Sequence, residues 1–537
     1  MNSITRNKTL LTCILIVAMF AVSACGGAGD SGTKAKKTIS IGMMNAPSGF
    51  NPLEWSDLAQ NVCTAILFKP LVEFDESMKH QPMLADSIET KDNQTFIVKL
   101  NANAKWTDGK PVTADDVIFT LNLISHPKVT ATVASNFNIL EGLDGNGKNP
   151  SGAIISGVKK IDDRTIAFKT KGPIDLTSFK EGIGTRLKTM PSHVLKDVAP
   201  EKLYQHPFMQ KPTVTNGPFK LVTYQKGQYV QFEANKDYFK GTPKLDALYF
   251  KIMPGANITA QLQSGEIDMN DPNLGMIPFE DTATLKSLSN VTADAGGIQS
   301  AVQTLMINLK TIPDVKVRQA ISHAINRPMI VEKLLKGDGV SVELPYIPSS
   351  PFLNKTLLPL TPFDPEKSKR LLQEAGWDAG RTINFAVPSG QKVREQVADI
   401  IVDNLKNVGI KVQIQKYDFV TSMAKAKKGE FDIYIIGLTV YPATPDASRL
   451  LKTGEPLNLS GYSNKEMDDL LLAGKSEVDP DKRKAIYDRV QELFARDLPS
   501  PSIYAQNALK VVSKRVKFGK PQSFGMYNDL EKWDVGN

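Results

Sequence analysis

The pattern of apolar and polar residues predicts strands and helices in alternation along the chain. TISIGMM at 38–44 alternates as a strand, and ETKDNQTFIVKL at 89–100 predicts a hairpin that turns at Asp92-Asn93. Residues 383–419 predict a strand, an amphipathic helix and a second strand. Such a βαβ unit joins two parallel strands, so we expect a partly parallel sheet.

A pattern of helix, glycine, acid and strand occurs twice, at ITAQLQSGEIDM (258–269) and at MAKAKKGEFDIYIIG (423–437). Gly265 and Gly429 suit the left-handed backbone position that follows a helix end, as does Gly409 in the βαβ unit. Because these α/β units lie far apart in the sequence, we expect two lobes, each with its own sheet.

The stretch GKPVTADDVIFTLNLI at 109–124 predicts the start of a helix. Thr113 can cap this helix, and Asp116 stands three residues later, as in a capping box. The neighbouring carboxylates of Asp115 and Asp116 also suit acid–base chemistry. Capping and the helix dipole explain both carboxylates more simply than catalysis does.

The first 25 residues carry an export signal. A basic start, Arg6 and Lys8, precedes an apolar run from Leu10 to Val22, which is shorter than the roughly 20 residues of a membrane-spanning helix. The run ends in Val-Ser-Ala-Cys, which resembles the bacterial lipobox, whose cysteine is lipidated and becomes the first residue of the mature protein.

We therefore expect residues 1–24 to be a signal peptide, Cys25 to be the lipidation site, and residues 25–37 to be a lipidated flexible tether rich in glycine, serine and lysine. The alternative is a plain secretory signal in which Cys25 is incidental. The apolar stretch VCTAILF holds another cysteine, Cys63, which we expect to be a buried small hydrophobic residue without a partner.

Composition narrows the class of protein. The 537 residues are 41% apolar and 23% charged, as in ordinary globular proteins, and they suffice for two or three domains. The net charge of +8 comes from charges that are mixed along the chain. We therefore expect no nucleic-acid partner, which would need a clustered basic face.

The usual catalytic and metal-binding motifs are not found in the sequence. It has no HExxH, CxxC or GxSxG, and its five histidines are scattered. We therefore expect no catalytic residue, no metal and no cofactor. An exported hydrolase remains the alternative from another class of function.

Seven stretches, in this order, carry a resemblance to a known family: AKWTDGKPVTADDVIFTL (104–121), TNGPFKL (215–221), ANKDYFKGTPKLD (234–246), QLQSGEIDM (261–269), IPDVKVRQAISHAIN (312–326), FDPEKSKRLLQEAGW (363–377) and GYSNKEMDDLL (461–471). They resemble extracytoplasmic solute-binding proteins of family 5, the oligopeptide- and dipeptide-binding lipoproteins of bacterial ABC transporters. The resemblance covers nearly the whole chain after the signal.

The resemblance implies an α/β, periplasmic-binding-protein-like two-lobe fold of type II, in the large three-domain cluster, with a ligand cleft between the lobes. It places the core of lobe I at 38–70 plus 206–305 plus 505–537, with an inserted domain of lobe I at 71–205. Lobe II would comprise 306–504.

The resemblance also implies a function. The chain would be the substrate-binding lipoprotein of an ABC importer, which captures peptides outside the cell and delivers them to the transmembrane subunits of a permease. We expect a monomer without enzymatic activity, lipid-anchored at the outer face of the cytoplasmic membrane. The alternative within the family is a non-peptide ligand such as a nickel chelate, haem or a sugar.

The expected ligand-binding residues lie in loops and strand ends that would face the cleft, because such positions commonly carry recognition. For Tyr346 and Tyr441 the alternative role is simple packing. The set is Asn45, Ser48, Phe50, Gln303, Thr304, Tyr346, Leu438, Thr439, Tyr441, Thr444 and Asp446.

Many relatives carry an aspartate in a Trp-rich segment of lobe II that pairs with the free amine of a peptide. The corresponding stretch here is GLTVYPATPDASRLL at 437–451. Leu438 replaces the Trp, Tyr441 and Thr444 stand where an aspartate is common, and Asp446 is the remaining acid. Asp446 is thus either the partner of a ligand ammonium or a cap for the helix that follows it.

Overall fold

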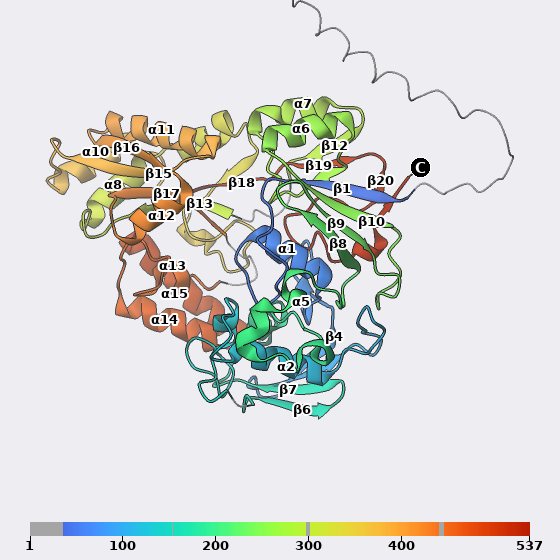
Figure 1. Ribbon diagram of the computed structural model, residues 1–537. Coiled ribbons are helices and arrows are strands. Elements are labelled where there is room, and N and C mark those ends of the chain that lie inside the picture. The colour runs from blue at the N-terminus through green and yellow to red at the C-terminus, as the bar shows by residue number, and fades with distance from the viewer. Residues whose placement is uncertain (1–35, 153, 297–300, 440–444, 537) are drawn as a thin grey trace, which may run out of the picture. The chain divides into compact units, whose positions relative to one another are not determined.

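The structure is a computed structural model that describes residues 36–152, 154–296, 301–439 and 445–536 (Figure 1). Its strands form sheets of seven, six and four strands and two separate strand pairs. The pairs are β2 (Val72–Phe74) with β3 (His80–Pro82), and β20 (Val516–Phe518) with β21 (Asp534–Val535).

The first sheet is mixed and has the order β12-β19-β11-β1-β10-β9-β8. Its central strand β1 runs parallel to β10 and β11, and the other neighbours pair antiparallel. Its strands are β1 (Thr38–Met43), β8 (Phe219–Gln225), β9 (Tyr229–Ala234), β10 (Ala247–Ile252), β11 (Met269–Asn270), β12 (Val291–Asp294) and β19 (Lys510–Ser513).

The second sheet has the order β14-β18-β13-β17-β15-β16. β15 runs parallel to both β16 and β17, whereas β13 pairs antiparallel with β17 and β18. Its strands are β13 (Ala301–Ile307), β14 (Gly339–Ser341), β15 (Thr382–Pro388), β16 (Lys411–Tyr417), β17 (Ile433–Thr439) and β18 (Ser502–Gln506).

The third sheet is antiparallel throughout, in the order β4-β5-β7-β6. Its strands are β4 (Ala85–Thr90), β5 (Thr95–Leu100), β6 (Val158–Asp162) and β7 (Thr165–Lys169). One core of buried side chains joins this sheet to the first. We call the body with these two sheets lobe I and the body built on the second sheet, residues 301–506, lobe II.

Helices cover the sheets (Figure 1). In lobe I they are α1 (Leu58–Leu67), α2 (Ala114–Ser125), α3 (Leu176–Phe179), α4 (Ser192–Leu195), α5 (Pro207–Gln210), α6 (Gly255–Ser264) and α7 (Thr282–Ser287). In lobe II they are α8 (Val315–Ala324), α9 (Arg327–Met329), α10 (Pro365–Glu374), α11 (Lys392–Asn407), α12 (Phe419–Lys427), α13 (Ser448–Leu451), α14 (Lys465–Ser476) and α15 (Pro480–Asp497).

Each face of the second sheet has its own apolar core, because successive side chains of a strand point to opposite faces. Leu305 and Ile307 of β13 pack with α8, α10 and α11. Met306, between them, packs with α12, α14 and α15 on the other face. A helix layer on both faces explains why the strands of lobe II are so apolar.

The chain crosses between the lobes after β12 and again after β18. Strands β13 and β18, which flank these crossings, both belong to the second sheet and pair with each other. The sequence places the limits between lobe I and lobe II at 305/306 and 504/505. Both positions fall inside strands of lobe II, β13 and β18. The sequence pattern of a strand does not reveal to which sheet the strand belongs. The division into domains stays a prediction.

The local predictions are confirmed. β4 and β5 form the hairpin that turns at Asn93, whose φ is 55°, and β15, α11 and β16 form the βαβ unit. Gly265, Gly409 and Gly429 have φ values of 78°, 92° and 73°. Asp116 accepts a hydrogen bond from the Thr113 N–H at 2.9 Å, so it completes the predicted capping box.

Gly217, in the stretch TNGPFKL, packs against the end of α1. A Cβ at this position would lie 1.9 Å from the Ile66 carbonyl oxygen, a backbone atom that no rotamer change can move away. Gly217→Ala should therefore lower the free energy of unfolding by about 3 kcal/mol or more. Gly145→Ala, where the added Cβ meets nothing within 4 Å, is the control in urea-induced unfolding, and equal losses would contradict the expectation.

A buried ion pair joins lobe I to lobe II. Arg483 of α15 places Nη1 2.7 Å from Asp175 Oδ2, and its Nη2 donates to Ser178 Oγ at 3.0 Å. The Arg483 and Asp175 side chains are only 8% and 12% exposed. About 300 residues of sequence separate the partners, so this contact depends entirely on how the two lobes meet.

Candidate functional site

A cavity of about 940 Å³ is lined by residues of both lobes. One wall comes from lobe I: a face of α1, the residues after β11, and the segment 522–528 near the chain end. The other wall comes from lobe II: strands β13 and β17 and the first turn of α11. This position between two sheets is typical of sites for small ligands.

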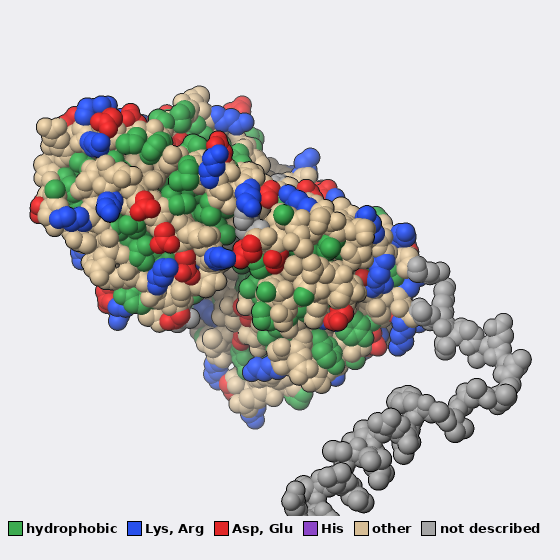
Figure 2. Space-filling model, turned by 90° about the horizontal axis from the view of Figure 1, so that it is seen from above, with side chains coloured by type: hydrophobic (Ala, Val, Ile, Leu, Met, Phe, Trp, Pro, Cys, Tyr) green, Lys and Arg blue, Asp and Glu red, His purple; other side chains and the backbone are tan. Residues whose placement is uncertain are grey.

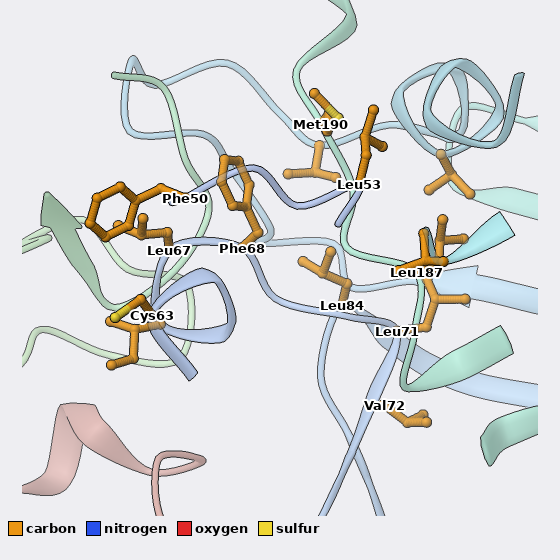
Figure 3. Close-up of a cluster of buried hydrophobic side chains, with 14 of the residues drawn as sticks. Phe50, Leu53, Cys63, Leu67, Phe68, Leu71, Val72, Leu84, Leu187 and Met190 are labelled. Atoms are coloured by element: carbon orange, nitrogen blue, oxygen red, sulfur yellow. The ribbon is translucent and has the colours of Figure 1, made fainter. Parts of the chain in front are cut away.

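One side of α1 faces the cavity and the other side faces the core. Leu58, Asn61, Val62 and Ala65 follow each other at helical spacing and line the cavity. On the opposite side Cys63 is fully buried among apolar residues that include Leu67 and Phe68 (Figure 3). Its full burial without a disulfide partner among the described residues confirms the expectation of a small hydrophobic core residue, and the burial raises the pKa of its thiol.

Arg394 of α11 is a charged and nearly buried residue of the lobe II wall. It is only 6% exposed, its Nε donates to Gln303 Oε1 at 3.1 Å, and burial lowers the pKa of its guanidinium. Among the described residues no carboxylate oxygen lies within 4.0 Å of this guanidinium. The wall therefore offers a largely desolvated positive charge. Within the described part of the chain, the side-chain N–H groups of Arg394 other than Nε donate to no acceptor, so they are open to a ligand.

Gly437 of β17 lets the chain approach this arginine closely. A Cβ at 437 would lie 2.8 Å from Gln303 Nε2 and 3.4 Å from Arg394 Nη2. Gly437, Gln303 and Arg394 therefore form one continuous patch of the cavity wall.

Carboxylates line the lobe I wall. Asp271 is buried, and it accepts hydrogen bonds from the Tyr527 hydroxyl at 2.6 Å and from the N–H groups of Asn273 and Leu274. Burial raises the pKa of Asp271. Glu73 pairs with the fully buried Lys69 at 3.0 Å. Both carboxylates are thus held by groups of lobe I itself.

A lysine and an arginine also line this wall. Lys188 Nζ donates to the Asn61 backbone oxygen at 3.0 Å and to Asn61 Oδ1 at 2.7 Å, and burial lowers its pKa to about 7. The Arg186 guanidinium stacks over the Trp55 ring at 3.9 Å. Both cations therefore interact with groups of lobe I, as Arg394 interacts with Gln303 in lobe II.

Two ion pairs cross from one lobe to the other beside the cavity. Glu280 of lobe I lies 2.6 Å from Lys392 at the start of α11. Lys286 of α7 lies 3.7 Å from Asp338. Elsewhere, on the face shown in Figure 2, basic and acidic side chains are interspersed and form no large patch of one sign.

Of the residues expected in the site, Gln303 lines the cavity. Its neighbour Thr304 is buried on the other face of β13, 3.3 Å from Ser502 Oγ. Asn45 and Ser48 are exposed and do not line the cavity, although Met44 does. Phe50 is buried in the lobe I core, where Figure 3 shows it beside Leu67.

The described side chains among the expected lobe II loop residues, Tyr346, Leu438 and Asp446, do not line the cavity. Tyr346 is buried and its hydroxyl donates to the Pro445 oxygen at 2.7 Å, which fits the packing alternative. Leu438 is partly buried and packs against the lobe II core that contains Met306, and the side chain of Thr439 is not described. Tyr441 and Thr444 lie outside the described residues.

Asp446 holds the start of α13. Its carboxylate accepts hydrogen bonds from the Ser448 N–H at 2.9 Å and from the Ser448 hydroxyl, and Lys475 Nζ lies 3.5 Å away. These contacts fit the capping alternative, and Asp446 does not line the cavity. Its role toward a ligand ammonium stays a prediction.

Sequence reasoning missed Arg394, although the helix pattern contains a signal for it. Arg394 stands three and four residues before Val397 and Ala398, both fully buried on the apolar stripe of α11. A charged residue on such a stripe is either buried with a partner or faces a site. Nothing comparable in the sequence points to Asp271 or Trp55.

Within the described ranges, no cluster of three or more His, Cys, Asp or Glu side chains could hold a metal ion. No helix in the same part of the chain is long and apolar enough to cross a membrane.

Comparison with known proteins places the chain in a family. The model of the family described as "Bacterial extracellular solute-binding proteins, family 5 Middle" matches residues 79–455. The oligopeptide-binding protein AppA of Bacillus subtilis is 29% identical over 564 residues, covering 98% of this chain and 99% of that protein. The dipeptide-binding protein of Escherichia coli is 28% identical, covering 90% of this chain and 91% of that protein.

Solved structures agree with the sequence comparison. The structure of Bacillus subtilis AppA in complex with a nonapeptide matches with a TM-score of 0.77 and 27% identity, covering 94% of this chain and all of that chain. The two-lobe α/β fold expected from the sequence is thereby confirmed. With its family match, its two lobes and the cavity between them, this chain belongs to the bacterial extracellular solute-binding proteins of family 5.

Proposed function

We propose that this solute-binding protein captures peptides between its lobes and delivers them to the permease of an ABC importer. The observation that carries the proposal is Arg394, a guanidinium that is only 6% exposed, lines the cavity and has no carboxylate oxygen of the described residues within 4.0 Å. A buried charge without a counter-ion is costly, so a ligand that brings an anionic group repays part of that cost.

A peptide fits the rest of the cavity. Its volume of about 940 Å³ accommodates a chain of several residues, and its walls mix polar side chains with apolar ones. Peptide amides can pair with polar groups and waters of the walls whatever the side chains are. Two relatives are named as an oligopeptide-binding and a dipeptide-binding protein. These names support peptides as the class of ligand.

Identification of the natural ligand tests the proposal. The protein is purified without added ligand, the bound small molecules are released with acid, and they are analysed by mass spectrometry. We expect short peptides that are recovered intact, because the chain belongs to a family of solute-binding proteins. A metal chelate, haem or a sugar in their place would contradict the peptide assignment, and cleaved products would favour the exported hydrolase.

Closure of the lobes around the ligand accompanies capture. Two ion pairs and the buried Arg483–Asp175 pair cross between the lobes, so the lobe contacts favour a closed state. Small-angle scattering of the ligand-free and the peptide-saturated protein should show compaction on binding. Identical curves at saturation would contradict a hinge motion.

The lipid anchor at Cys25 is part of the proposed function. An anchored receptor stays at high local concentration near its permease at the outer face of the membrane. The support is the Val-Ser-Ala-Cys string after an apolar run. Cys25→Ser should release the protein into the medium or leave it unprocessed, as cell fractionation would show. Unchanged membrane association of a processed variant, from which the signal peptide has been removed, would contradict the anchor.

A further inference from the structure

Three large apolar side chains of the lobe I wall are exposed. Met44, Leu58 and Met276 are 38%, 41% and 46% exposed, and all three line the cavity. Of the ten large apolar side chains that are this exposed among the described residues, the other seven lie away from the cavity. Exposed apolar surface in a water-filled cavity is unfavourable until a ligand covers it.

Neighbouring regular elements and backbone hydrogen bonds position the residues that carry these side chains. Met44 follows β1 directly, and its N–H donates to the Leu274 oxygen at 2.7 Å, which brings the segment with Met276 beside the end of that strand. A Cβ on Gly255 would lie 2.9 Å from the Met276 oxygen and 3.7 Å from Met44 Sδ, so the two methionine residues adjoin. Leu58 is the first residue of α1, which Asp57 caps.

This apolar surface and the charged group of the other lobe line the same cavity. The ion pair between Glu280 and Lys392, at 2.6 Å, brings the segment after Met276 to the start of α11. Arg394 stands two residues after Lys392 on the same helix. Arg394, Met44 and Met276 line the same cavity, so a ligand whose anionic group contacts Arg394 can also reach the exposed methionine residues.

We propose that Met44, Leu58 and Met276 form an apolar subsite that takes one large apolar side chain of the bound peptide. The inference rests on the proposed function and adds a ligand preference to it: peptides that carry leucine, methionine or phenylalanine at one position. Methionine is flexible and polarizable, so the subsite accepts aliphatic and aromatic side chains alike. Burial of such a side chain raises affinity about tenfold to a hundredfold.

Isothermal titration calorimetry with the full chain tests the subsite. The ligands are pentaalanine and the five peptides in which one alanine is replaced by leucine. The variants are Met44→Ser/Met276→Ser and Leu58→Asn, and the control is Leu472→Ser, an exposed leucine on α14 that does not line the cavity. Because the replaced side chains are exposed, circular dichroism should show that all variants fold.

We expect one leucine position to raise the affinity of the unmodified protein at least tenfold. This gain should fall below threefold in the double variant and persist in Leu472→Ser. The subsite is wrong if the peptides bind but no leucine position raises affinity. It is also wrong if the affinity gained from leucine persists in the Met44→Ser/Met276→Ser variant. In both cases the protein still binds peptides. If none of the six peptides binds, the peptide function fails and the subsite fails with it.

Discussion

Replacement of Arg394 by glutamine should lower the affinity for an anionic peptide by roughly 30-fold to several thousandfold, the equivalent of about 2–5 kcal/mol. The guanidinium is nearly buried, so its attraction to a ligand anion is weakly screened by water. Arg394→Lys keeps the charge but loses the forked N–H groups, so it should restore only part of the affinity. Titration calorimetry gives the dissociation constants.

Two comparisons make this prediction specific. Arg370→Gln, an exposed arginine on α10 of the same lobe, is the matched control and should leave affinity unchanged. Without ligand, Arg394→Gln should not lower the melting temperature, because it removes a buried charge that has no carboxylate oxygen of the described residues within 4.0 Å. A lower melting temperature with intact affinity would make Arg394 a structural residue and contradict its role in binding.

Replacement of Arg483 by methionine should lower the free energy of unfolding by about 3–5 kcal/mol. The variant leaves the Asp175 carboxylate, only 12% exposed, without its cation. It also removes the hydrogen bond to Ser178 that joins the lobes. Because the pair connects the two lobes, the same variant should shift the protein toward an open state, which small-angle scattering would detect.

The helix that carries Arg483 also supplies its control. Arg489 of α15 pairs with Glu466 at 2.8 Å and with Glu492 at 2.9 Å, but its side chain is 47% exposed. Arg489→Met should therefore cost less than about 1 kcal/mol. The double variant Asp175→Asn/Arg483→Met should recover part of the loss, since it leaves no unpaired charge. Equal losses for Arg483→Met and Arg489→Met in urea-induced unfolding would refute the assignment.

The sequence by itself determined the local structure. The hairpin at Asn93, the capping box of Thr113 and Asp116, and the βαβ unit that ends its helix before Gly409 all follow from residues a few positions apart. Such features depend on backbone sterics and on neighbours along the chain, which the sequence shows directly. The ordered stretches that resemble family 5 also predicted the fold and the solute-binding role correctly.

The tertiary structure decided which side chains reach the cavity. β13 places Gln303 in the cavity wall and turns Thr304 to the opposite face, and the sequence pattern alone did not distinguish the two. Asp446 accepts a hydrogen bond from the Ser448 N–H at the start of α13. Arg394 lines the cavity, although it stands on the side of α11 that the apolar pattern predicts to be buried. The limits between the two lobes likewise depend on which sheet β13 and β18 join. The cavity itself and the pair of Asp175 with Arg483 rest on contacts between segments hundreds of residues apart, and only the packing of one lobe on the other creates them.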